Sequence, residues 1–202
     1  GRGSGFLAPD FDSYGESTSE SAGESADHTR ERKIRIPYYF NIAPDRDLML
    51  AYTRMSSRGT IIESKYRQLF DRKITEDGDK DSIFEIEFQY LFKDKIFEDM
   101  SDEERAKLLY QNSYRWLVDM STELEISNNI HLSARYNRVS DKNYFNEIVH
   151  TNTDAESLNS HFKVSYNNTK KHLNAELLTE DEQIVNDGSP NYTRAIEASI
   201  SK

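Results

Sequence analysis

The feature that most constrains this chain is a period-two alternation of large apolar and polar residues. It is clearest at residues 82–95, where most residues between the apolar positions are polar and the apolar positions are Phe84, Ile86, Phe88, Tyr90 and Phe92. Successive side chains of a strand point to opposite faces of its sheet. The pattern therefore predicts a strand with one apolar and one polar face.

The same alternation recurs along most of the chain. It predicts further strands over residues 33–42, 47–55, 60–70, 116–126, 130–139, 161–168, 170–179 and 192–199. Short turns or polar loops separate them, the longer loops being expected at 75–81, 146–158 and 180–190. Strands joined in this way pair with their sequence neighbours in antiparallel fashion. We expect an all-β chain with eight strands and the beginning of a ninth.

One stretch lacks the alternation of apolar and polar residues that is typical of a strand. Residues 101–111 open with Ser101-Asp102-Glu103-Glu104 and continue with good helix formers. A serine followed three residues later by a glutamate is a capping-box signature, in which each side chain satisfies the other residue's backbone N–H. The sequence predicts a short helix inside a loop.

Composition narrows the class of protein. The 202 residues include 12 Tyr, 10 Phe and one Trp, although 31% of the chain is charged. Disordered segments with this much charge are poor in aromatic residues, so a folded chain is expected. Aromatic residues that alternate with charged ones suit a transmembrane β-barrel, which is apolar outside and polar inside. A soluble β-rich domain with the two faces reversed fits the same pattern.

Several other classes are disfavoured. A net charge of −10 and a pI near 5, with no basic stripe, argue against a nucleic-acid-binding protein. No run of 18 or more apolar residues exists that would span a membrane as a helix. No signal-peptide pattern opens the chain, so we expect the true N-terminus of the protein to lie upstream.

The sequence contains no signature of catalysis or of cofactor binding. Cysteine is absent, which removes disulfides, thiol nucleophiles and thiolate metal sites. The five histidines lie on different predicted elements without metal-ligand spacing, and neither a G-x-S-x-G elbow nor a phosphate-binding glycine loop occurs. We predict no enzyme, no metal site and no cofactor.

The N-terminal part contains two features that predict how the chain is organised, a polar segment and a proline within a strand. Residues 10–32 are rich in Ser, Gly and acidic residues and almost devoid of apolar ones, so a flexible linker is predicted there. The first long strand carries Pro37, which has no N–H to contribute to a ladder. A strand with an internal proline is expected at a sheet edge or at a weak seam.

Three blocks, in order along the chain, resemble the LptD family of outer-membrane lipopolysaccharide-assembly proteins. The first is Ser4-Gly5-Phe6-Leu7 followed by Pro9. The second reads P-Y-Y-F-N-I-A-P over 37–44 and is followed by Arg58-Gly59, and the third covers 136–146. The resemblance extends over about 145 residues and implies a partial chain: residues 1–9 as the end of a periplasmic jellyroll, 10–32 as a linker, and 33–202 as the first strands of a transmembrane β-barrel.

The resemblance also implies a function and partners. In that family lipopolysaccharide reaches the outer leaflet of the outer membrane, its acyl chains leaving through a lateral gate between the first and last barrel strands and its sugars passing through the lumen. Pro37 matches the first-strand proline of that gate, whereas Tyr52 stands at the second-strand proline position. Implied partners are lipopolysaccharide, an LptE-like plug lipoprotein and an LptA-like periplasmic bridge. The implied location is the outer membrane, with the N-terminal end in the periplasm.

Charged residues on the polar faces of the predicted strands are expected to face the barrel lumen, because a charge facing lipid at mid-depth costs about 2–4 kcal/mol. These residues are Glu63, Lys65, Arg67, Glu85, Glu87 and Lys163. Another outer-membrane barrel, such as a porin or a receptor, and a soluble β-rich binding domain remain the alternatives.

Overall fold

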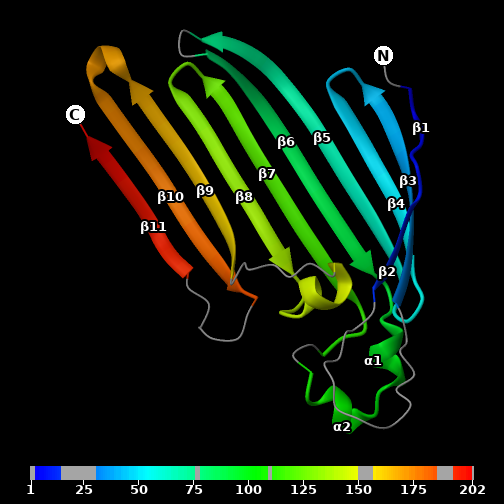
Figure 1. Ribbon diagram of the computed structural model, residues 1–202. Coiled ribbons are helices and arrows are strands. Elements are labelled where there is room, and N and C mark those ends of the chain that lie inside the picture. Colours follow the sequence, from blue (N-terminus) through cyan, green and yellow to red (C-terminus); the bar gives the residue numbers. More distant parts are fainter. Residues whose placement is uncertain are drawn as a thin grey trace.

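The computed structural model describes residues 3–14, 31–75, 78–108, 111–149, 157–185 and 193–201. They form one antiparallel sheet in which spatial order follows chain order from β3 to β11, and the short β1 and β2 both pair with β3 (Figure 1). The prediction of an all-β chain is confirmed. The strands are β1 (Gly5–Phe6), β2 (Asp10–Tyr14), β3 (Glu31–Ala43), β4 (Arg46–Met55), β5 (Gly59–Thr75), β6 (Gly78–Leu91), β7 (Arg115–Ser127), β8 (Ile130–Val139), β9 (Ser157–Asn168), β10 (Leu173–Ile184) and β11 (Thr193–Ser201).

The pairing register divides the sheet into an aromatic face and a polar face. One row across β3–β7 consists of Ile36, Tyr52, Ile62, Tyr90 and Trp116, which pair in succession and so share the aromatic face. Large apolar side chains on this face remain exposed in part, including Ile36 at 40% and Phe88 at 37%. A contiguous apolar surface of this kind marks a contact with membrane or protein.

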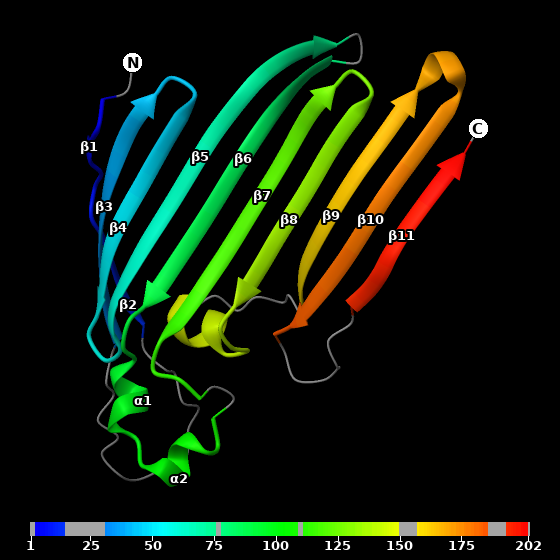
Figure 2. The ribbon, with the colours of Figure 1, turned by 180° about the vertical axis from the view of Figure 1, so that it is seen from behind.

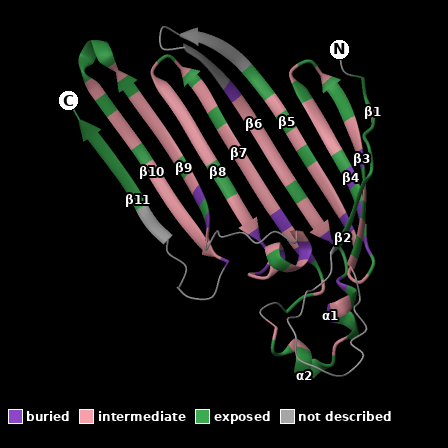
Figure 3. Ribbon diagram, viewed as in Figure 1, coloured by how far each residue is buried: buried purple, intermediate pink, exposed green. Residues whose placement is uncertain are grey.

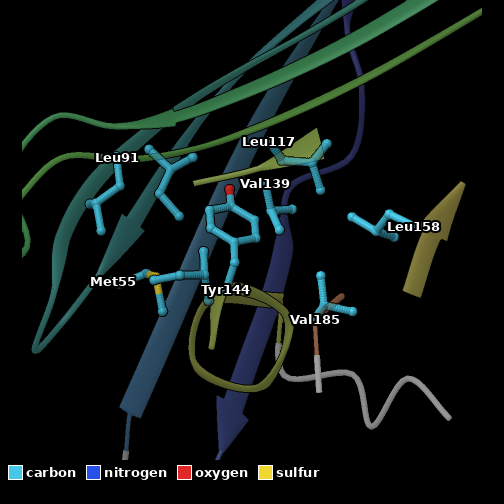
Figure 4. Close-up of a cluster of buried hydrophobic side chains, with 9 residues drawn as sticks. Met55, Leu91, Leu117, Val139, Tyr144, Leu158 and Val185 are labelled. Atoms are coloured by element: carbon cyan, nitrogen blue, oxygen red, sulfur yellow. The ribbon is translucent and has the colours of Figure 1, made fainter. Parts of the chain in front are cut away.

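The hydrophobic core lies at one end of the polar face. There the strands contribute an apolar row instead of charges, and residues after β8 cover it. The buried cluster consists of Met55, Ile61, Leu91, Leu117, Val139, Tyr144, Ile148, Leu158 and Val185. Figure 4 shows Tyr144 among these side chains. Figure 3 shows buried residues concentrated near this end of the strands.

The short helices belong to the same end of the molecule. Helices α1 (Lys95–Asp99) and α2 (Asp102–Arg105) lie in the β6–β7 connection, and a π-helical turn, η1 (Phe145–Val149), follows β8 (Figure 2). At the opposite end β9 and β10 are joined by a 3₁₀ turn, η2 (Thr169–Lys171). None of the helices in the described ranges is long and apolar enough to cross a membrane.

The predicted loop helix is confirmed as α2. Ser101 Oγ accepts a hydrogen bond from the Glu104 backbone N–H at 3.4 Å, and the Glu104 carboxylate accepts one from the Ser101 N–H at 2.9 Å. Helix α1 was not predicted, since residues 92–95 were assigned to a strand. That strand ends at Leu91 because the Asp94 carboxylate accepts from the Ile96 N–H at 3.1 Å and thereby begins a helix.

The predicted linker over 10–32 is wrong at both ends. Asp10–Tyr14 forms β2, and Glu31 and Arg32 already belong to β3. These residues bury little apolar surface, since Phe11 is 72% exposed, but β3 offers them unpaired backbone groups, and an ion pair of 3.2 Å joins Asp10 to Arg35. Residues 15–30 lie outside the described part of the chain.

Three predicted loops are shorter in the structure. β5 extends to Thr75 and β6 begins at Gly78, so most of the loop expected at 75–81 belongs to strands. β9 begins at Ser157 and β10 continues to Ile184. Polar residues fill these strand ends because the neighbouring strand satisfies their backbone groups without any apolar pattern. Residues 76–77, 150–156 and 186–190 of the expected loops lie outside the described ranges, as does residue 192 of the strand expected at 192–199.

Candidate functional site: the outer edge of β3 and the polar face

The backbone of Pro37 is directed away from β4. The Leu7 N–H donates to the Pro37 carbonyl at 3.0 Å, and the Asn41 N–H donates to Ser4 Oγ at 2.9 Å, so odd-numbered residues of β3 direct their polar groups toward the N-terminal segment. In an antiparallel strand the N–H and C=O of one residue point to the same side. The nitrogen of Pro37 therefore faces the outer edge of β3, and its missing N–H is missing from that edge.

The pairing on this outer edge is interrupted at Pro37. Phe6 pairs with Tyr38 and Asp10 with Arg35, so the N-terminal segment advances four residues (6 to 10) while β3 retreats three (38 to 35). One extra residue on one strand is a β-bulge, which disrupts the ladder locally. Among the described residues, the partners of β3 other than β4 are thus two short strands that are offset from each other.

Tyr52 has the opposite orientation. It pairs with Ile36, whose backbone groups face β4, so the two residues form a hydrogen-bonded pair of the β3–β4 ladder. A proline at position 52 would remove one bond of that pair, whereas tyrosine keeps it. The ladder defect from proline is therefore confined to the outer edge of β3.

All six charged residues predicted to face the lumen lie on the polar face. Glu63 links two strands, accepting from Arg35 Nε at 2.8 Å and from Thr53 Oγ1 at 2.5 Å. Lys65 and Glu87 are cross-strand partners with 3.7 Å between Nζ and a carboxylate oxygen.

The remaining residues of that set continue the mixed-sign surface. Arg67 pairs with Asp47 at 2.6 Å and stands directly across the ladder from Glu85. Lys163 pairs with Glu176 at 2.9 Å. Most of these ion-paired side chains are partly exposed. The polar face therefore offers many hydrogen-bond donors and acceptors to water or to a polar ligand. Whether the face lines a lumen stays a prediction.

A buried ionic cluster closes the core end of the polar face, and we call it the arginine cluster: Arg58, Asp94, Arg115, Asp141 and Glu147. Arg115 is fully buried and donates to both oxygens of Asp141, at 2.9 and 2.6 Å. It also donates to Glu147 at 2.7 Å and to Asp94 at 3.4 Å. Arg58 lies 2.6 Å from Asp94 and 3.0 Å from Glu147.

The cluster joins segments that are distant in sequence. Arg58 comes from the β4–β5 turn, Asp94 from the β6–β7 connection, Arg115 from the start of β7, and Asp141 and Glu147 from the residues after β8. Two guanidinium groups face three carboxylates, which balances most of the buried charge. This arrangement satisfies what a buried charge requires, namely partners and directed hydrogen bonds.

Tyr144 connects the cluster to the apolar core. Its ring centroid lies 5.8 Å from the Arg115 guanidinium carbon, and its hydroxyl donates to Gln89 at 3.2 Å. Burial raises the pKa of the Tyr144 hydroxyl, so it stays protonated as a donor. Sequence reasoning noted the 136–146 block only as a family resemblance and missed Arg115 altogether. A charged residue at the first position of a strand is common, and nothing local marks this one as buried.

The described histidines form no metal site. His131 lies 3.0 Å from Glu123 and 3.1 Å from Glu125, and His161 lies 3.0 Å from Ser133. Within the described ranges no group of three or more potential ligands converges on one point.

Comparison with known proteins identifies relatives over most of the chain. The family described as LPS transport system D matches residues 113–195. The LPS-assembly protein LptD of Idiomarina loihiensis is 27% identical over 199 residues, which cover 98% of this chain and 22% of that protein. The protein of the same name from Shewanella frigidimarina is 29% identical over 189 residues, covering 90% of this chain and 20% of the relative. The chain thus spans about a fifth of the length of these relatives.

A further relative, the LPS-assembly protein LptD of Ralstonia nicotianae, is 43% identical over a shorter stretch of 68 residues. The family match includes Arg115, Asp141 and Glu147 of the arginine cluster, and the two longer alignments extend over nearly the whole sheet. These matches, together with the antiparallel fold, show that the chain is similar to LptD proteins over most of its length.

Proposed function

We propose that this chain is a wall segment of an outer-membrane barrel that delivers lipopolysaccharide to the outer leaflet. The relatives carry the name LPS-assembly protein, and the two-faced sheet supports a barrel wall. The aromatic face would meet lipid, since its large apolar side chains are covered by nothing in the described part of the chain. The polar face would line an aqueous lumen, through which the sugars of the substrate pass.

The location of the charged pairs on one face favours this orientation of the sheet over the reverse orientation. The charged pairs of β4–β7 lie on the polar face, and turning that face toward lipid would cost about 2–4 kcal/mol for each Lys or Arg at mid-depth. In the proposed orientation they remain hydrated. Transport of this kind needs no covalent chemistry.

The observation that carries the gating proposal is the direction of the Pro37 backbone. In the proposed barrel the outer edge of β3, which pairs with β1 and β2 in this structure, is the seam at which the last strand would take their place. Because Pro37 has no N–H on this edge, the seam has one hydrogen bond fewer, worth about 0.5–1.5 kcal/mol net. Tyr52 keeps the β3–β4 ladder intact, so the seam opens in preference to the neighbouring ladder.

The proposed partners follow from the similarity to LptD proteins and from the proposed location. Lipopolysaccharide is the substrate, an LptE-like lipoprotein fills part of the lumen, and an LptA-like protein bridges the periplasm toward a jellyroll that residues 1–9 would end. The N-terminal end accordingly lies in the periplasm.

The test is a Pro37→Ile substitution in the complete protein, expressed in its own bacterium. Isoleucine restores an N–H directed at the seam, and we expect slower appearance of newly made lipopolysaccharide at the cell surface and entry of large antibiotics, with normal amounts of folded protein. Pro44→Ala is the matched control, because Pro44 lies in the β3–β4 turn and has no place in the seam. Surface lipopolysaccharide at the wild-type rate in the Pro37→Ile strain would remove Pro37 from the mechanism.

A further inference from the structure

The ladder between β8 and β9 is complete at one end of the strands and absent at the other. Backbone pairing runs from Ile130 with Tyr166 to Arg135 with His161. β8 nevertheless continues to Val139, and β9 already begins at Ser157. Four residues at the end of β8 therefore have no backbone partner in β9, although a regular strand pair would continue through them.

Side chains take the place of the missing ladder. The Asn137 N–H donates to Ser160 Oγ at 3.0 Å, and Ser160 Oγ donates to the Asn137 carbonyl at 3.4 Å. The Val139 N–H donates to Gln183 Oε1 at 3.0 Å, and Gln183 Nε2 donates to the Val139 carbonyl at 2.9 Å. A carboxamide has the same donor and acceptor as a peptide group, so Gln183 acts as a substitute backbone.

Gln183 reaches across an entire strand to do this, because it belongs to β10 and pairs there with Leu158 of β9. The side chain of Arg138 bridges the same gap, donating to the Asp181 carboxylate and, at 3.5 Å, to the Leu158 carbonyl. Backbone groups that are buried must be satisfied, and here the partners are flexible side chains instead of a rigid ladder.

Packing is also loose where the strands part. A hollow of about 250 Å³ lies there, and among the residues that line it are five of the aromatic face: Met120, Ala134, Tyr136, Phe162 and Thr179. On the polar side the Asn137 Oδ1 atom is buried, and no described residue donates to it. Buried polar atoms normally have a hydrogen-bond partner, so a surface hollow beside one without a described partner marks a junction that is not regularly paired.

We propose that the β8–β9 junction is a hinge in the wall. The part containing β9–β11 pivots against the part containing β3–β8 about the intact pairs between residues 130 and 135. Gln183 and Ser160 are positioning residues that hold the junction and release it without breaking any backbone ladder. The hinge is distinct from the proposed seam at Pro37, from which five further strands separate it.

Disulfide trapping tests the open geometry in the complete protein in detergent micelles. Extending the register beyond Arg135 and His161 would place Asn137 opposite Asn159. The pair N137C/N159C should therefore oxidise at least tenfold more slowly than S133C/K163C, whose positions are true cross-strand partners, since a disulfide needs Cβ atoms about 3.5–4.5 Å apart. Equal oxidation rates would overturn the proposal.

Amide hydrogen exchange tests the motion. Gln183→Met removes both substitute hydrogen bonds at similar side-chain length, and we expect the Val139 amide to exchange at least tenfold faster while residues 130–135 keep their protection. Gln68→Met, on β5 and away from the junction, is the matched control and should leave Val139 unchanged. An unchanged Val139 amide, or loss of protection throughout 130–135, would refute the hinge. Neither experiment involves lipopolysaccharide, so the results are independent of the Pro37 test.

Discussion

Arg115 is the residue whose replacement should cost most stability. Its side chain is fully buried and makes four hydrogen bonds to three carboxylates, those of Asp94, Asp141 and Glu147. In Arg115→Met the apolar volume is kept while the charge is lost. The arginine cluster then changes from two arginines against three carboxylates to one against three.

The size of the expected stability loss follows from the burial of the carboxylates that lose Arg115 as a partner. Asp94 and Asp141 side chains are 0% and 1% exposed, and only Asp94 retains an arginine, Arg58. Removing one partner of a buried ion pair costs about 3–5 kcal/mol, because the remaining charge stays desolvated. We expect a loss of that size in the free energy of unfolding.

Urea unfolding of the complete protein in detergent micelles, followed by its strand circular dichroism signal, measures the loss. Arg135→Met is the control, since Arg135 pairs with Asp119 at 3.0 Å in a half-exposed position, where an ion pair is worth about 0–1 kcal/mol. In a double-mutant cycle with Asp141→Leu, the double variant should lose at least about 1 kcal/mol less than the sum of the single losses. If Arg115→Met lowers the free energy of unfolding by no more than Arg135→Met does, the arginine cluster does not stabilise the connections between the strands.

Three further predictions concern other parts of the molecule. Cysteines at Lys65 and Glu85 should react with water-soluble maleimides in the membrane-embedded protein; reaction with lipid-soluble reagents alone would reverse the assignment of the two faces. Gly59→Ala should lower the free energy of unfolding by about 1–3 kcal/mol, and with it the urea midpoint, because Gly59 has φ 124° and an added Cβ would lie 2.8 Å from the Lys93 carbonyl oxygen; an unchanged midpoint contradicts this. Hydrogen bonds from the backbone and side chain of its capping partner lower the pKa of Glu104, so its contribution to α2 is present above the ordinary glutamate pKa of about 4.3 and is lost as pH falls through the lowered value; loss of α2 amide protection, measured relative to the intrinsic exchange rate, that begins near neutral pH as the pH is lowered would disprove it.

Strand faces and strand order were predictable because both depend on a local pattern. The alternation at 82–95 fixes which side chains share a face, and short connections force sequence neighbours to pair. Strand ends were not predictable in the same way. The β5–β6 hairpin continues through residues that read as a polar loop, because its stability there comes from the ladder and not from an apolar stripe.

The site was predictable in part for the same reason. A proline in a strand indicates an edge, but the side to which its nitrogen points depends on the register of β3 with β4 and with the N-terminal segment. The arginine cluster lay beyond sequence reasoning, since Arg58 and Glu147 are 89 positions apart (147 minus 58) and meet only through tertiary packing. Gln183 was missed because a glutamine that substitutes for backbone has no local signature.

The meander order of the sheet has a consequence for how the chain folds. From β3 to β11 every strand pairs with its predecessor in sequence, so each hairpin forms by closing a loop much shorter than the whole chain, which is a small entropic cost. Contacts of this kind permit addition of one strand at a time to a growing edge. Tyr144 and the residues around it are different, because they contact side chains from β4 to β9, and Val185 after β10, which reach the cluster separately. Their docking closes the largest loops, and we infer that it is the last local event, completed only when the preceding hairpins are in register.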